Sequence, residues 1–186
     1  MGEEFDGTDA GEGGVALPGL GNNVAKIFAG RASARIEGPF VIFLIGFRIN
    51  RFFAFGKWMP VARAMGPMIR ELVAHPEMGF LYAEPMFTWR GVAMVQYWRS
   101  FEQLHTYAQD RNAHHLPAWA AFNRSVGSDG SVGIWHETYE VAANRYECVY
   151  ANMPLWGLAK AGKQVAATGR RQGAKDRMGL PSDEDS

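Results

Sequence analysis

The order of strand-like and helix-like patterns between residues 40 and 141 most constrains the fold of this chain. Short runs of β-branched and aromatic residues predict strands, and apolar residues that recur every three or four positions predict helices. The patterns fall at Phe40–Asn50 (strand), Trp58–His75 (helix), Gly79–Thr88 and Val92–Trp98 (strands), a helix beginning at Ser100, and Val132–Val141 (strand). This order predicts an α+β fold of the ferredoxin-like β-α-β-β-α-β type with an antiparallel sheet.

Local signals support the helices. Pro60 suits the first turn of the first helix, whereas Pro67 predicts a kink or a break within it. Ser100 with Gln103 forms a capping-box pattern, and Phe101, Leu104 and Ala108 give the second helix an apolar stripe. A further short helix is expected at about Ala113–Val126.

The strand patterns at residues 40–50, 92–98 and 132–141 are apolar at both odd and even positions, so both faces of the sheet must be covered. Helices cover one face. For the other face, the simplest cover is a second copy of the same sheet, which predicts a homodimer. Dimeric α+β barrels are built in this way, with a pocket between each sheet and its helices.

The 186 residues fit one domain with two tails. The Gly-rich, acidic segment 1–38 is expected to be a disordered tail, residues 39–162 to form the domain, and residues 163–186 to form a disordered C-terminal tail. Within the domain, a fifth strand is expected at Arg145–Asn152 and a helical turn at Pro154–Ala161.

Composition excludes several classes of function. Lys and Arg number 19, as do Asp and Glu, so no net charge draws the chain to nucleic acid. The single cysteine, Cys148, excludes an intrachain disulfide, and an acidic N-terminus does not resemble a secretory signal, so we expect a cytoplasmic protein. The longest apolar run, Phe40–Phe47, is too short to span a bilayer. Neither a metal-ligand spacing nor a nucleotide-binding motif is present.

The segment Val95–Arg124 concentrates the residues that could carry chemistry. His115 shares one face of the expected helix with Trp119 and Phe122, and Asn123 follows them in the same segment. His115 could be a general base, a haem ligand or a hydrogen-bond donor to a substrate; alternatively, it is a partly buried histidine bonded to a backbone carbonyl.

Other candidates lie on the strands. Arg48, followed by Asn50, ends an apolar strand and must either bind an anionic substrate group or pair with Glu137 or Glu84. His136 could line one side of the sheet. The aromatic residues could form a pocket wall or simply belong to the core, and they are Tyr97, Trp98, Trp119 and Trp135.

Four runs together resemble a known family: FVIFLIGFRINR, VQYWRSFEQLHTYAQDRNAHHLPAWAAFNR, GIWHETYEV and YECVYANMP. The family is a bacterial and fungal domain of unknown function that is also described as monooxygenase-like, after a member in the fungal fumagillin pathway. It is similar to the dimeric α+β barrel superfamily, which includes cofactor-independent antibiotic-biosynthesis monooxygenases and haem-dependent aldoxime dehydratases. The resemblance covers about residues 40–162.

The resemblance implies oxidation of a small apolar or aromatic, polyketide-like substrate without a cofactor. His115 would be the base, and the groups that stabilise negative charge would be Asn123, Asn50, Trp98 and Arg48. Two alternatives stay open. One is a haem enzyme of the same fold with His115 as the iron ligand, and the other is a non-catalytic dimer that binds a small ligand.

Overall fold

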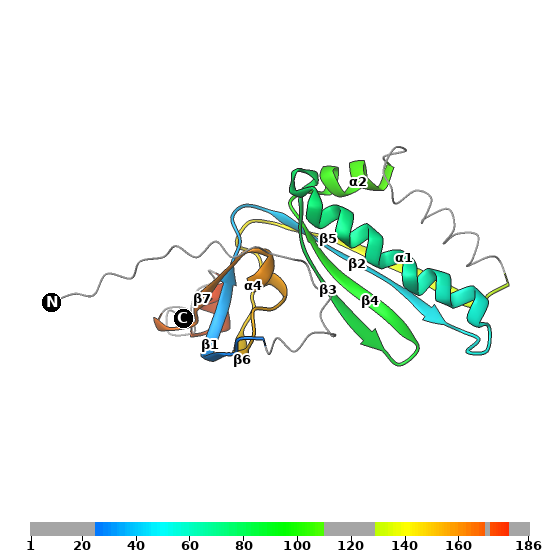
Figure 1. The fold of residues 1–186 in the computed structure, drawn as a ribbon. Helices are drawn as coiled ribbons and strands as arrows, with labels where there is room; N and C mark the ends of the chain where they lie inside the picture. The colour runs from blue at the N-terminus through cyan, green and yellow to red at the C-terminus, as the bar shows by residue number, and fades with distance from the viewer. Residues whose placement is uncertain (1–24, 110–128, 170–171, 179–186) are drawn as a thin grey trace.

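A four-stranded antiparallel sheet carries helices on one of its faces (Figure 1). This computed structural model describes residues 25–109, 129–169 and 172–178. The strands are β2 (Phe40–Ile49), β3 (Phe80–Thr88), β4 (Gly91–Trp98) and β5 (Val132–Val141), in the order β3-β4-β2-β5. With helices α1 (Phe55–Ala74) and α2 (Phe101–Gln109), they confirm the expected ferredoxin-like order.

Strand register decides which side chains face the helices. Val41, Phe43 and Ile45 of β2 lie opposite Trp98, Gln96 and Met94 of β4, respectively. These pairs share the face that packs against α1 and α2, with Leu72 and Leu104 of the helices in the same core. Alternate residues of each strand occupy the other face, called here the second face.

Helix α1 continues through both of its prolines. The break expected at Pro67 is therefore not found. Pro67 lies on the exposed side of the helix, where water can satisfy the carbonyl that loses its backbone partner. At α2, the Gln103 backbone amide donates to the Ser100 hydroxyl oxygen at 3.2 Å, as the capping-box pattern predicts. The apolar stripe of α2 consists of Leu104 and Tyr107, whereas Phe101 is exposed.

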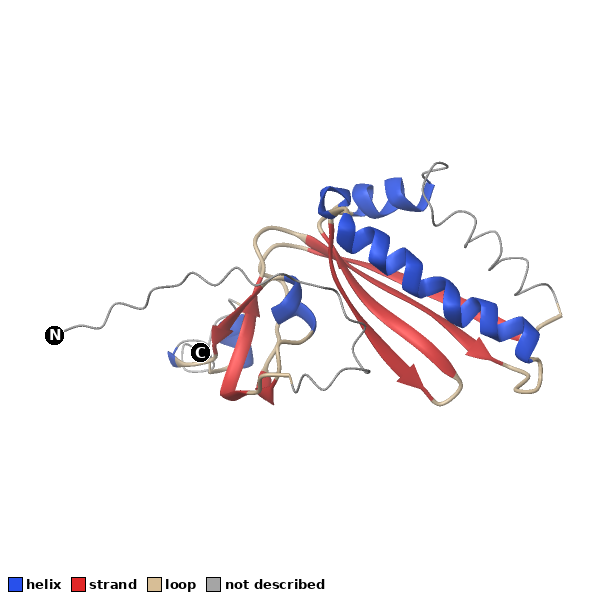
Figure 2. Cartoon of the chain, viewed as in Figure 1, coloured by secondary structure: helices blue, strands red, loops and turns tan. Residues whose placement is uncertain are grey.

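The segments that precede and follow the main sheet in the sequence form a second, three-stranded sheet (Figure 2). Strand β1 (Phe28–Arg35) pairs antiparallel with both β6 (Tyr150–Met153) and β7 (Lys163–Ala166). Two short helices accompany it, α4 (Gly157–Ala161) and α5 (Ala174–Arg177).

The expected tails are therefore too long. Residues 28–35 lie within the expected tail 1–38, and residues 163–166 and 174–177 lie within the expected tail 163–186, yet all three segments form regular structure. Their backbone partners are distant in sequence, so no local pattern predicts the pairing. The expected fifth strand is also shorter than 145–152 and belongs to this sheet, not to the main one.

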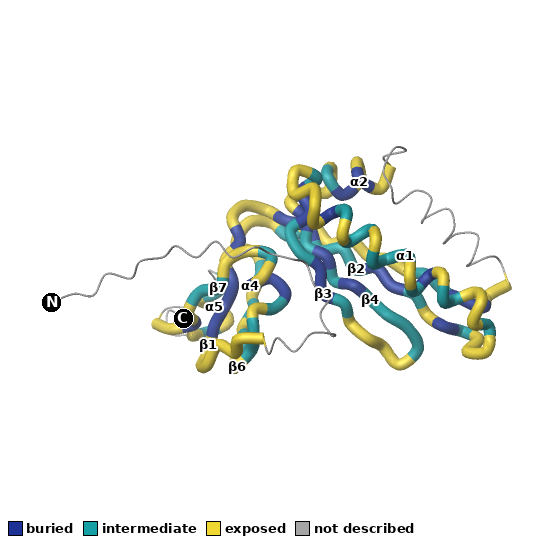
Figure 3. Tube along the Cα trace, in the orientation of Figure 1, coloured by how far each residue is buried: buried dark blue, intermediate teal, exposed yellow. Residues whose placement is uncertain are grey.

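The three-stranded sheet and α4 cover one end of the second face. Ala34, Ile36, Leu158 and Ala159 form a buried cluster with Phe40, which stands at the start of β2. The expectation that a second copy covers this whole face is therefore wrong for this end, because the chain folds back on itself there. Figure 3 shows the buried parts of β2, β3 and β4 beneath α1.

Within the described ranges, no helix is long and apolar enough to cross a membrane.

Leu72 tests the packing between α1 and the sheet. Its side chain is 1% exposed, whereas that of its neighbour Val73 is 39% exposed. We expect Leu72→Ala to lower the free energy of unfolding by about 2–5 kcal/mol through the cavity it creates. The control Val73→Ala should change it by less than about 0.5 kcal/mol. Urea denaturation followed by circular dichroism measures both, and equal effects would contradict the packing described.

Candidate functional site

Among the described residues, the candidates predicted on the strands do not converge on one point. Tyr97 and Trp98 are neighbours in β4 and therefore face opposite sides of the sheet. Trp98 and His136 face the helices, whereas Tyr97 and Arg48 belong to the second face. His115, Trp119 and Asn123 lie outside the described residues, within the connection from α2 to β5.

Trp98 is a core residue. Its side chain is 0% exposed, and its ring contacts Phe80 and Tyr107 at centroid distances of 5.4 and 5.6 Å. The indole Nε1 donates to Gln96 Oε1 at 2.9 Å, which satisfies the polar groups of both buried side chains. Trp98 therefore holds the sheet to the helices, as the core interpretation of the aromatic residues predicts.

His136 is an exposed histidine on the helix-covered face. It stands opposite Ile45 in the β2–β5 pairing, and its ring lies 5.8 Å from that of Phe43. Thr138 follows on the same face of β5 and is also exposed. This part of the face thus brings an imidazole and a hydroxyl next to the Phe43 ring.

Arg48 and Asn50 form a separate polar group at the end of β2. Arg48 Nη1 donates to Asn50 Oδ1 at 2.5 Å, and Asn50 Nδ2 donates to the Gly130 carbonyl at 3.1 Å. The expected pairing of Arg48 with Glu84 or Glu137 is wrong. These carboxylates accept hydrogen bonds from tyrosines two residues away, Tyr82 and Tyr139 respectively.

A carboxylate–phenol pair between α1 and α2 was not predicted from the sequence. Burial raises the pKa of Tyr107, and the charge of Glu71, together with a hydrogen bond to it, raises that pKa further. Tyr107 also packs on Trp98, so the pair lies at the edge of the central core. A signal was available, because Tyr107 follows Leu104 by three residues on the buried stripe of α2.

A cluster of tyrosines where α4 covers the second face was also not predicted from the sequence. Glu84 is 4% exposed and accepts a hydrogen bond from Tyr82, whose ring lies 4.7 Å from Lys160 Nζ. Burial raises the pKa of Tyr82, and likewise that of Tyr97. Tyr97 therefore helps to join α4 to the sheet, on the side away from His136.

Gly157 allows α4 to approach these tyrosines. Its φ is +53°, and a Cβ there would lie 3.3 and 3.4 Å from the hydroxyl oxygens of Tyr97 and Tyr150. A larger residue would thus be strained by its backbone conformation and crowded by both hydroxyls.

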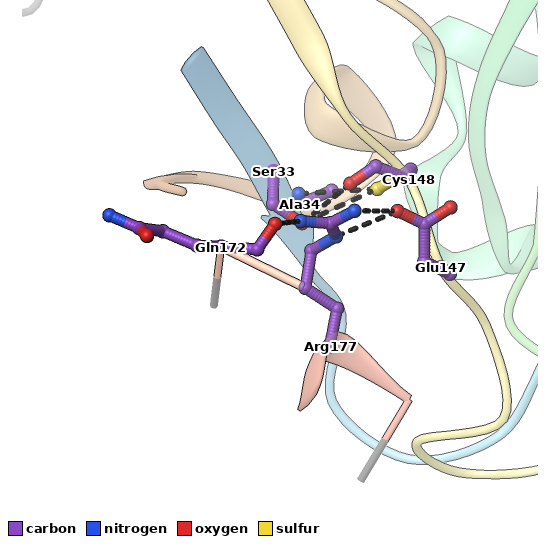
Figure 4. Close-up of polar contacts among 6 residues, drawn as sticks. All are labelled: Ser33, Ala34, Glu147, Cys148, Gln172 and Arg177. Carbon is purple, nitrogen blue, oxygen red and sulfur yellow. Dashed lines mark hydrogen bonds and ion pairs between the residues drawn. The ribbon is translucent and has the colours of Figure 1, made fainter. Parts of the chain in front are cut away.

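One hollow lies beside the three-stranded sheet. Its volume is about 570 Å³, and its lining includes Arg35, Arg145 and the ion pair of Arg177 with Glu147. Arg177 Nε lies 2.7 Å from Glu147 Oε1, while the Cys148 sulfur accepts the Ala34 amide at 3.3 Å nearby (Figure 4). Another hollow, of about 210 Å³, lies between Met78 and Tyr107.

The family assignment follows from the sequence of the sheet and its helices. The model of a family described as monooxygenase af470-like matches residues 40–158, well over half of the chain. The chain belongs to the monooxygenase af470-like family. The matched region runs from the first residue of β2 into α4, so it includes the whole four-stranded sheet. No curated protein sequence matches the chain significantly.

Solved structures with little sequence identity resemble this family member. An aldoxime dehydratase (OxdRE), solved in complex with butyraldoxime, aligns with a TM-score of 0.55 at 13% identity. The alignment covers 87% of this chain and 46% of the dehydratase, so the chain spans about half of that protein's length. SnoaB, a cofactor-independent oxygenase from Streptomyces nogalater, aligns with a TM-score of 0.37 at 14% identity over 54% of this chain and 90% of SnoaB. The dehydratase alignment supports a shared fold.

In the described part of this family member, no three or more His, Cys, Asp or Glu side chains are grouped so as to hold a metal ion. The described residues that line these hollows include no histidine.

Tyr107 predicts a dependence of stability on alkaline pH. Because its pKa is raised on folding, it stabilises the folded state fully below the ordinary tyrosine pKa of about 10. That contribution is lost as the pH rises through this value towards the folded-state pKa, since the unfolded chain loses its proton first. We expect the urea midpoint to fall above pH 10 and to fall less steeply in Tyr107→Phe. Equal slopes in both proteins would contradict the described burial of Tyr107.

Proposed function

We propose that this protein is a monooxygenase-like enzyme that oxidises a small apolar or aromatic, polyketide-like substrate between its sheet and helices. The observation that carries the proposal is the family match over residues 40–158. His136 supports this location, because it brings a titratable ring to the helix-covered face beside Phe43.

The proposed reaction needs no bound oxidant other than dioxygen. A base removes a proton from an activated methylene of an electron-rich substrate, and the resulting carbanion transfers electrons to O₂. One oxygen atom ends in the new carbonyl group, and the other leaves as water with the two hydrogens of the methylene. The protein must therefore supply a base, an apolar cavity and donors to the developing negative charge.

The residues proposed for the site differ in how well their positions suit a role in the reaction. His115 remains the proposed base, with Trp119 and Asn123 as its neighbours on the expected helix, and His136 is a second candidate. The described positions of Arg48, Asn50 and Tyr97 are away from His136, and Trp98 is enclosed. We therefore propose that these four residues support the structure and do not contact the substrate.

Oxygen uptake tests the reaction and its base. With anthrone as a probe of an activated aromatic methylene, we expect one O₂ to be consumed for each carbonyl formed. Loss of the general base should lower kcat by about 10²–10⁴-fold. His115→Ala and His136→Ala should show which histidine has this role, and His75→Ala is the control, because His75 pairs with Glu77 on the exposed end of α1.

Each result has a separate meaning. Full activity in both His115→Ala and His136→Ala would refute the assignment of the base. Absence of oxygen uptake across a panel of activated phenols and methylenes would refute the oxygenase proposal and favour a ligand-binding protein. Titration with haemin addresses the remaining alternative, since a Soret band that is lost in His115→Ala would identify a haem enzyme.

We further propose that the protein is a homodimer formed through the part of the second face that α4 leaves open. Trp135 and Tyr139 of β5 are 39% and 50% exposed there, and the Trp135 ring lies over Gly46 of β2. Such aromatic exposure on a sheet face is typical of a surface that is covered in an assembly.

Substitutions on the two faces of β5 test the dimer. We expect Trp135→Glu to reduce the mass in solution from two chains to one, because it places a charge in an apolar contact. Thr138→Glu, an exposed position on the opposite face of the same strand, should leave the mass unchanged. Light scattering after size exclusion measures both, and a wild-type mass of one chain would refute the proposal.

A further inference from the structure

Two turns at one end of the main sheet expose a group of aromatic side chains. One is the connection from β2 into α1, residues 51–57, and the other is the β3–β4 turn with its flanks, residues 86–90. Phe53, Phe87 and Trp89 are 93%, 86% and 90% exposed. Phe52, Phe55 and Met86 add further exposed apolar surface. We name these two segments together the aromatic tip; Figure 1 shows both at the ends of their strands and helix.

The two halves of the aromatic tip are fixed to each other. Arg90 donates from Nε to the Ile49 carbonyl and from Nη2 to the Asn50 carbonyl, both at 2.9 Å. Its guanidinium also lies 5.2 Å from the centre of the Phe52 ring. Next to it, a Cβ on Gly91 would lie 2.0 Å from the Phe47 carbonyl oxygen, so only glycine allows this approach. The exposed rings therefore project from a rigid base.

Positive charge is in excess around these rings. Residues 48–57 and 86–91 contain Arg48, Arg51, Lys57 and Arg90 but neither Asp nor Glu. Among the described residues, Asp129 approaches this group and pairs with Lys57 at 3.6 Å. The aromatic tip thus combines exposed rings with an excess of positively charged side chains. Peripheral proteins bind anionic bilayers through surfaces of this composition.

We propose that the aromatic tip binds the surface of an anionic lipid bilayer, with Phe53, Phe87 and Trp89 inserted among the headgroups. A two-fold contact between copies is disfavoured, because it would bring each tip's cations against those of the partner. The surface proposed for the dimer lies elsewhere, on the second face. The proposal does not depend on the chemical reaction, since a bilayer can be bound without any substrate present.

Vesicle sedimentation with the full chain tests this proposal. We expect the protein to sediment with phosphatidylcholine vesicles that contain phosphatidylserine, and much less with phosphatidylcholine alone or at high salt. Arg51→Gln should weaken binding about fivefold, since one cation near an anionic surface contributes about that factor. Combined Phe53→Ser, Phe87→Ser and Trp89→Ser should weaken it by at least tenfold. Phe101→Ser, an exposed position on α2, should bind as the wild type does.

Three results would overturn the proposal. The first is wild-type protein that stays in the supernatant with anionic vesicles. The second is a triple variant that sediments as well as the wild type. The third is a triple variant that is folded by circular dichroism but has half the wild-type mass in solution, which would make the tip a contact between copies. If the triple variant does not fold, Phe53→Ser alone serves, because its ring is 93% exposed.

Discussion

Strand β2 is paired along both edges and carries apolar side chains on both faces, and the rest of the structure depends on this constraint. Its pairing with β4 and β5 fixes which residues face α1 and which face α4. Val41 and Ile45 bring α1 onto one face, and Phe40 brings the three-stranded sheet onto the other. Because a one-residue slip would exchange these two sets, both coverings together specify the register.

Much of the main sheet could be predicted from sequence because its signals are local. The apolar run of β2 and the Ser100 cap each depend on neighbouring residues, and the structure confirms both. Strand β1 carries no such signal. Its buried residues are Ala32, Ser33 and Ala34, which are too small and mixed to indicate a strand until β6 and β7 pair with it.

The candidate site was harder to predict, because side chains that are near in sequence diverge in a strand. Tyr97 and Trp98 suggest one aromatic wall, but they face opposite layers and belong to different cores. Conversely, Glu71 and Tyr107 come from separate helices and interact only because α1 and α2 pack on the same face. The helical spacing of apolar residues in α2 could place Tyr107 on a buried stripe. Its carboxylate partner, Glu71, can be identified only from the tertiary structure.

The aromatic tip and the proposed substrate are connected by the same physical property. An apolar, electron-rich molecule partitions into a bilayer for the reason that Phe53 and Trp89 do, namely the removal of apolar surface from water. Helix α1, which packs on the sheet face where the substrate is proposed to bind, begins within the aromatic tip at Phe55. Contact with a bilayer would therefore hold the N-terminal end of α1 at the lipid surface, where such a substrate is concentrated. The substrate would then cross less water before it reaches the sheet.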